Sequence, residues 1–232
     1  MNRSPFHIGE QQAQTRVGVR EVIEPWARRA VRRFMPDQHR EFYTRLPFIV
    51  AAARDDAGRP WATLLLGPPG FVQSPDDRGL LLATRPLQGD ALESSLTAGT
   101  ELGLLGIELE TRRRNRVNGT VSEAGAAGLR FEVGQAFGNC PQYLTERRWR
   151  QVDVDPAAAV VSRHDRLDGD MQAWIRSADT MFIASGYRSD DGPGEIFGMD
   201  ASHRGGMPGF VKVLGDRRLV VPDYAGYNHF NT

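Results

Sequence analysis

Residues 47–66 read PFIVAAARDDAGRPWATLLL, which places two apolar runs on either side of a turn. The sequence DDAG at residues 55–58 is typical of a turn, because Asp and Gly adopt the backbone conformations that turns require. Each flanking run has the length and the apolar content of a short strand. The stretch therefore predicts two strands joined by a turn.

Similar runs follow at residues 80–83, 102–109, 116–123 and 129–133, and strand-like segments return at 180–187, 209–213 and 219–221. Many short strands separated by turns are typical of an antiparallel barrel or sandwich. Helices are predicted over residues 22–35, 38–46, 90–98, 142–149 and 171–178. In the first of these, Val22, Trp26 and Ala30 form an apolar stripe. The predicted fold class is mainly β with helices, an α+β protein.

The second strand region resembles the first in three blocks that occur in the same order. Ordered matches indicate an internal repeat, although unrelated strand–turn–strand units also look alike. The second copy reaches Thr232 before the strands that would close a barrel, and an unclosed sheet has unpaired edges. We therefore expect either that the chain continues further or that another subunit covers the edge. The matched blocks are 48–51 with 182–185, 69–72 with 208–211, and 77–80 with 216–219.

The composition is that of an ordinary globular protein, with 40% hydrophobic and 25% charged residues. Its 29 basic and 29 acidic residues give a net charge of zero, which predicts neither nucleic acid nor a membrane as a partner. The single Cys140 can form no disulfide within the chain and no zinc site. The first ten residues lack the apolar core of a signal peptide. Together these features predict a cytoplasmic protein.

Several motifs resemble the pyridoxamine 5′-phosphate oxidase-like flavoproteins, and the resemblance extends over most of the chain. The strings FGNCPQY at residues 137–143 and SHRGG at 202–206 are specific to one subgroup of that family. Further matching segments are LPF at 46–48, GRPW at 58–61, GF at 70–71, LLGI at 104–107, TRRRNR at 111–116 and NG at 118–119.

The resemblance implies a six-stranded antiparallel split β-barrel that binds FMN, in a homodimer with the flavin near the subunit interface. Some members of the subgroup are fused to ferredoxin-reductase-type modules, so a reductase is a candidate partner beside a small-molecule substrate. Together with the strand pattern, the resemblance divides the chain into four parts. These are an N-terminal helical segment (1–46), a first split barrel (47–150), a connection with a helix (151–178) and a second, incomplete barrel-like repeat (179–232).

Ser202, His203 and Arg204 offer a hydroxyl, an imidazole and a guanidinium in succession, which are suitable donors for a flavin phosphate. Gly205 lets the backbone come close to a ligand, and Lys212 adds a charge nearby. Further amide, hydroxyl and guanidinium groups complete the predicted cofactor site. They belong to Asn228, Asn231, Thr232, Arg116 and Asn118. The competing interpretation is an exposed, glycine-rich loop without a ligand.

Residues 112–116 contain four arginines. One interpretation is a solvated hairpin between two strands; the other is an anion site for the flavin phosphate or for an acidic substrate. Cys140 has no neighbouring His or Lys that would activate a thiol, so a structural role is favoured over a redox role. The histidines have no metal-ligand spacing, so no metal is expected.

The first hypothesis for the function is an FMN-dependent oxidoreductase. The flavin supplies the electron transfer in such enzymes, so no catalytic triad is required. The second hypothesis is a non-catalytic module that holds flavin or another ligand, or a part of a larger multi-domain oxidoreductase. Pyridoxamine phosphate oxidase activity itself ranks third, because the sequence lacks the Arg-Leu-x-Pro-type tail of those enzymes.

Overall fold

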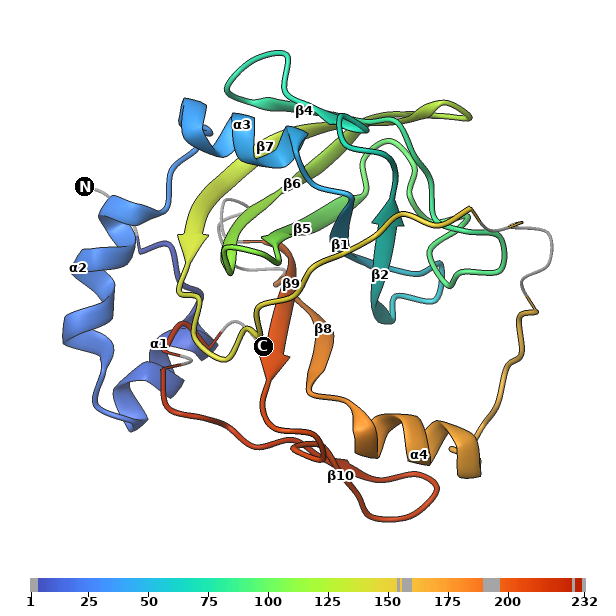
Figure 1. Ribbon diagram of the computed structural model, residues 1–232. Helices are drawn as coiled ribbons and strands as arrows, with labels where there is room; N and C mark the ends of the chain where they lie inside the picture. Colours follow the sequence, from blue (N-terminus) through green and yellow to red (C-terminus); the bar gives the residue numbers. More distant parts are fainter. Residues whose placement is uncertain (1–3, 154, 156–159, 190–196, 227, 231–232) are drawn as a thin grey trace.

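The chain between residues 48 and 139 forms one seven-stranded antiparallel sheet, in the order β2-β1-β5-β6-β7-β4-β3 (Figure 1). The computed structural model describes residues 4–153, 155, 160–189, 197–226 and 228–230. The resemblance implied six strands; the sheet has seven, of which β3 is only two residues long. The strands are β1 (Phe48–Arg54), β2 (Pro60–Leu66), β3 (Val72–Gln73), β4 (Gly79–Leu82), β5 (Glu101–Glu108), β6 (Arg113–Gly125) and β7 (Gly128–Asn139).

Strands β1 and β5 are buried on both faces. Ala51 and Leu104 belong to the main hydrophobic cluster, whereas their neighbours Val50 and Leu105 belong to a second cluster. Successive side chains of a strand point to opposite faces of the sheet, so each of these strands separates the two clusters. Burial on both faces explains why both segments are continuous apolar runs in the sequence.

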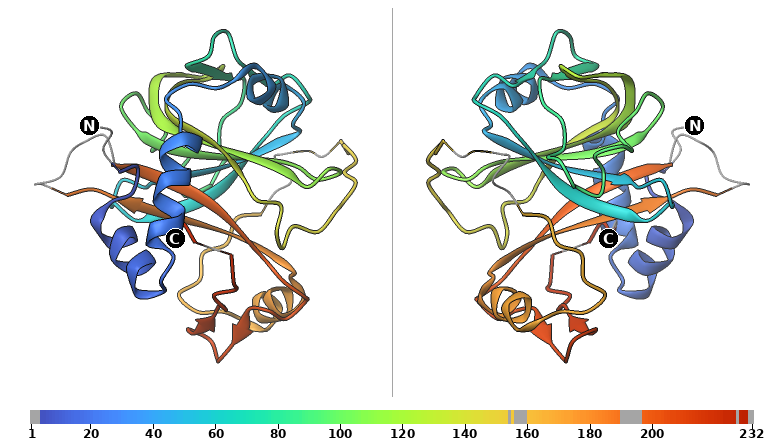
Figure 2. Two further views of the ribbon diagram at one scale, coloured as in Figure 1. Left: turned by 90° about the vertical axis from the view of Figure 1, so that its left-hand side faces the viewer. Right: turned by 90° about the vertical axis from the view of Figure 1, so that its right-hand side faces the viewer.

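A separate two-stranded hairpin covers the second cluster. It consists of β8 (Thr180–Tyr187) and β9 (Gly198–Gly205), which pair antiparallel. Figure 2 shows the hairpin crossing the sheet on the side away from β4 and α3. At the crossing, a Cβ on Gly103 of β5 would lie 2.3 Å from the backbone oxygen of Met199. The close approach of β9 to β5 therefore requires glycine at residue 103.

Four helices flank the strands. Helices α1 (Ile8–Arg16) and α2 (Arg20–Ala30) contact each other beside the sheet, and α3 (Asp37–Thr44) contributes Phe42 and Tyr43 to the main cluster (Figure 1). Helix α4 (Gly169–Ser177) precedes β8, and the Asp168 side chain accepts a hydrogen bond from the Met171 N–H at its start. Helix α4 contacts β10 (Lys212–Val213), which pairs with β11 (Leu219–Val220).

Several predicted helices differ from the observed ones. Helix α2 ends at Ala30 rather than at residue 35, and its buried residue is Ala27, whereas Val22 of the predicted stripe is 79% exposed. The segments 90–98 and 142–149 consist of turns and irregular chain. None of the described helices has the length and apolar character needed to cross a membrane.

The same order of elements occurs twice along the chain. The series α3, β1, β2, β3 and β4 is followed later by α4, β8, β9, β10 and β11. The second series differs in its surroundings, because β4 pairs with β7 whereas β11 pairs with β10 alone among the described strands.

Candidate functional site

Strand β6 turns alternate side chains toward the β8–β9 hairpin. Val117 lies in the main hydrophobic cluster, so its neighbours Arg116 and Asn118 point the other way. Arg116 donates from Nη2 to the Ser202 hydroxyl at 2.7 Å and from Nη1 to an Asp200 carboxylate oxygen at 3.0 Å. Asn118 donates to the same oxygen of Asp200 at 2.7 Å. These bonds join β6 to β9 through polar groups, of which Arg116 and Ser202 are buried and Asn118 and Asp200 are partly buried.

Arg114, two residues earlier on β6, makes the corresponding contacts nearer the end of the strand. Its Nε donates to the backbone oxygen of Cys140 at 2.6 Å, and its Nη1 lies 3.3 Å from Nδ1 of His203. A guanidinium can only donate, so His203 Nδ1 accepts and the ring proton lies on Nε2.

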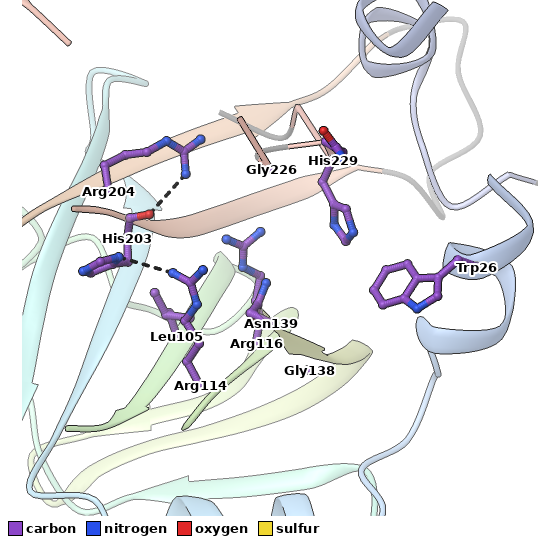
Figure 3. A pocket seen from close by; sticks show the side chains of 11 residues that line it. Trp26, Leu105, Arg114, Arg116, Gly138, Asn139, His203, Arg204, Gly226 and His229 are labelled. Atoms are coloured by element: carbon purple, nitrogen blue, oxygen red, sulfur yellow. Dashed lines mark hydrogen bonds between the residues drawn. The ribbon is translucent and has the colours of Figure 1, made fainter. Parts of the chain in front are cut away.

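A cavity of about 80 Å³ opens among these groups, and we call it the cationic pocket (Figure 3). Three guanidinium groups reach it, from Arg114 and Arg116 of β6 and from Arg204 of β9. Helix α2 adds an indole, and the segment after β11 adds an amide and an imidazole. The lining residues are Trp26, Leu105, Arg114, Arg116, Gly138, Asn139, His203, Arg204, Gly226, Asn228 and His229.

The two histidines of the pocket are neutral at physiological pH. Burial, together with the charges of Arg114 and Arg204, lowers the pKa of His203 to about 3. Burial also lowers the pKa of His229 to about 4, with Arg116 as a second cause. The positive charge of the pocket therefore comes from its arginines, of which Arg116 is ion-paired with Asp200. Such a pocket attracts an anion.

Two buried polar atoms of lining residues lack a hydrogen-bond partner within the described part of the chain. They are the Arg116 Nε donor and the Asn139 Oδ1 acceptor. An unsatisfied buried donor costs about 1–3 kcal/mol. A ligand oxygen beside Arg116 Nε would remove this cost, so the donor set fits an anionic oxygen group.

The structure brings together most of the residues predicted from the sequence. His203, Arg204, Asn228 and Arg116 line the pocket. Ser202 and Asn118 do not line it. Ser202 accepts a hydrogen bond from Arg116, and Asn118 donates to Asp200, which also accepts from Arg116.

Three of the other predicted residues lie elsewhere or outside the described residues. Lys212 is exposed on β10 and does not line the pocket. Asn231 and Thr232 fall outside the described residues.

Gly205 meets the loop after β7 rather than the cavity, because a Cβ there would lie 2.1 Å from the backbone oxygen of Tyr143. The glycine is thus needed for packing between two segments of the chain.

Asn139, His229 and Trp26 line the pocket although the sequence did not indicate them as site residues. Arg114 was included only in the run 112–116, for which an anion site was one of two interpretations. Its two-residue spacing from Arg116 and Asn118 indicates a shared strand face. Trp26 was assigned to an apolar stripe. No sequence signal connects α2 with β9.

A family model described as pyridoxamine 5′-phosphate oxidase matches residues 35–162. That span contains α3, the whole seven-stranded sheet and five of the lining residues, Leu105, Arg114, Arg116, Gly138 and Asn139. It contains neither the α1–α2 pair nor the β8–β9 hairpin. No curated protein matches the chain.

Among solved structures, HupZ from Group A Streptococcus is 12% identical, with a TM-score of 0.35, over 45% of this chain and 93% of that chain. A variant of HupZ in which one histidine is replaced by alanine is 14% identical, with a TM-score of 0.35, over 45% of this chain and 99% of that one. An F420 reductase is 11% identical, with a TM-score of 0.28, over 46% of this chain and 97% of that one. Likenesses this weak support no conclusion about the ligand.

Proposed function

The chain belongs to the pyridoxamine 5′-phosphate oxidase family, and on this premise we propose that it binds FMN through the cationic pocket and acts as an FMN-dependent oxidoreductase on a small molecule. The observation that carries the proposal is the convergence of three guanidinium groups on one small cavity. One of them, Arg116, has a buried Nε donor without a partner among the described residues. Arginine is well suited to phosphate because its fork of N–H donors matches the phosphate oxygens.

The phosphate would be held from two strands. Arg114 and Arg116 approach from β6, and Arg204 approaches from β9. His203 adds an N–H donor without adding charge, since its Nδ1 accepts from Arg114 and its pKa is low. Asp200 and Ser202 fix the Arg116 guanidinium, which leaves its Nε to meet the ligand. Bound FMN would supply the electron transfer, and the protein would bind and orient it.

The finer features of the architecture belong to the same proposal. We propose the four-part division at residues 1–46, 47–150, 151–178 and 179–232, with the last part an incomplete repeat of a six-stranded split barrel. The repeated order of one helix and four strands supports this division. The proposal includes a cytoplasmic homodimer and a reductase as the electron donor.

One observation favours a second candidate function. The cavity of about 80 Å³ is small beside the roughly 300–1,000 Å³ of pockets that hold whole small-molecule ligands. A non-catalytic module that binds a small anion would need no more space than this. Under the first proposal, only the phosphate occupies the cavity and the remainder of FMN extends past its mouth.

Titration of the purified protein with FMN separates these functions. The oxidoreductase proposal predicts a yellow complex whose absorbance bleaches with a reductant. Replacing Arg204 with Ala is expected to weaken FMN binding by about 2 kcal/mol, roughly 30-fold, because a charge-assisted phosphate contact is lost. Lys212→Ala serves as the control, since Lys212 is a neighbouring cation that does not line the pocket. Equal FMN affinity of both variants would remove Arg204 from the site.

A further inference from the structure

The α1–α2 pair covers one side of the cationic pocket, although it lies outside the span that the family model matches. Its contribution to the pocket is Trp26, on α2. Figure 3 shows the indole at the end of a side chain that reaches from α2 toward His229 and Arg116. This part of the site is therefore an addition to the matched region.

Trp26 is held in place by contacts of the helical pair with the rest of the molecule. Gln14 of α1 is fully buried and donates to the backbone oxygen of His229 at 3.1 Å. Two residues after the C-terminal end of α2, Arg32 exchanges two backbone hydrogen bonds with Ala136 of β7, at 3.0 and 2.7 Å. The helical pair that carries the indole is thus tied to the His229 segment and to β7.

An aromatic cluster backs the indole. The His229 ring lies 5.3 Å from Trp26, 5.6 Å from Phe6 and 5.8 Å from Phe137, measured between ring centroids. Phe6 and Phe137 are buried, whereas Trp26 is 43% exposed. Trp26 and His229 are the members of the cluster that line the pocket, and the indole is the larger and more exposed of the two rings.

We propose that Trp26 binds the planar aromatic ring of the ligand whose phosphate the pocket arginines hold. This inference rests on the proposed function and adds to it the residue that contacts the ring of the ligand. An indole face prefers offset-stacked or edge-to-face contact with another ring. Its position on the α1–α2 pair gives the chain a selectivity for the ring that the matched family region does not supply.

The test compares three probes, FMN, riboflavin and inorganic phosphate, on Trp26→Leu and Trp26→Phe. Trp26→Leu is expected to raise the dissociation constants of FMN and riboflavin alike, by about tenfold. The affinity of Trp26→Leu for inorganic phosphate, measured by competition against FMN, should equal that of the parent protein. Trp26→Phe should restore binding, because phenylalanine retains an aromatic face. Trp174→Leu is the matched control, since Trp174 is 78% exposed on α4 and does not line the pocket.

The outcomes distinguish this inference from the function on which it rests. If Trp26→Leu binds FMN and riboflavin as the parent protein does, while Arg204→Ala weakens FMN alone, the ring-binding role is wrong and the phosphate site stands. If Trp26→Leu also loses inorganic phosphate, or if Trp26→Phe fails to restore the flavins, the indole acts as a structural support and the inference is overturned. A parent protein that binds neither flavin overturns both proposals.

Discussion

Neighbouring arginines in one short segment have different surroundings. Arg112 is exposed in the turn before β6, with a φ of 57°, as the solvated-hairpin interpretation predicts. Arg114 and Arg116 are buried and line the cationic pocket, as the anion-site interpretation requires. Arg112 lies in the turn because β6 begins at the next residue, whereas Arg114 and Arg116 share one face of the strand. The sequence could therefore identify the cluster of charges but not its buried members, which depend on where the strand begins.

Replacing Arg116 with Lys tests the importance of guanidinium geometry. Lysine keeps the charge but cannot bind Ser202 and Asp200 at once as the guanidinium does. We expect a loss of about 2 kcal/mol in unfolding free energy, because buried polar groups lose partners, together with weaker FMN binding. Arg112→Lys should change neither quantity. Urea unfolding and FMN titration of both variants measure these effects, and an Arg116→Lys protein with parental stability would contradict the role assigned to the network.

At the level of elements, strands were predicted better than helices. The runs at 102–109 and 129–133 correspond to β5 and β7 because burial leaves a clear apolar pattern. Helix α1 was missed because its sequence, IGEQQAQTR, has no apolar stripe. Strand β9 was missed because several of its inward residues are polar. Ser202 and Asp200 are satisfied by Arg116 of β6, a pairing that no local pattern reveals.

The crossing of β9 over β5 gives a prediction about Gly103. An alanine there would place its Cβ 2.3 Å from the Met199 backbone oxygen, so the hairpin must move. We expect Gly103→Ala to lower the unfolding free energy by about 1–3 kcal/mol and to weaken FMN binding. Gly125→Ala is the control, because a Cβ at that end of β6 would meet nothing within 4 Å. Thermal unfolding measures the stability of both variants. If Gly103→Ala and Gly125→Ala are equally stable, β9 does not cross β5 as closely as described.

On the scale of the whole molecule, buried titratable groups should set the pH dependence of stability. Burial raises the pKa of Glu10 to about 8. Burial lowers the pKa values of His39, His203 and His229 to about 4, 3 and 4. Below pH 6.5 the unfolded chain binds protons that these folded histidines do not bind, so stability falls with acid. Between pH 4.5 and 8 the folded chain retains a proton on Glu10 that the unfolded chain has lost. Glu10 opposes the three histidines below pH 6.5, and above that pH its effect prevails, so stability falls as the pH rises.

The expected result is therefore maximal stability near pH 6.5, with an alkaline slope of about 1.4 kcal/mol per pH unit from Glu10. Glu10→Gln should flatten that alkaline slope and make the fall in stability below pH 6.5 steeper, because Glu10 opposes the histidines between pH 4.5 and 6.5. Glutamine can still accept the His7 N–H bond made by Glu10. Denaturant unfolding from pH 5 to 8.5 measures both slopes. A parent protein without the alkaline slope would show that Glu10 is not buried as described.

The cationic pocket has one wall on the seven-stranded sheet and another on the β8–β9 hairpin. A local opening that lifts the hairpin off β5 would dismantle the pocket while the larger sheet stayed folded. A phosphate-bearing ligand that contacts both walls should therefore stabilise the packing of the hairpin against the larger sheet. Ligand binding would favour the closed state over the open one, so amide hydrogen exchange in β9 would slow by the factor by which that equilibrium shifts. Exchange at the centre of β6 and β7 would scarcely change.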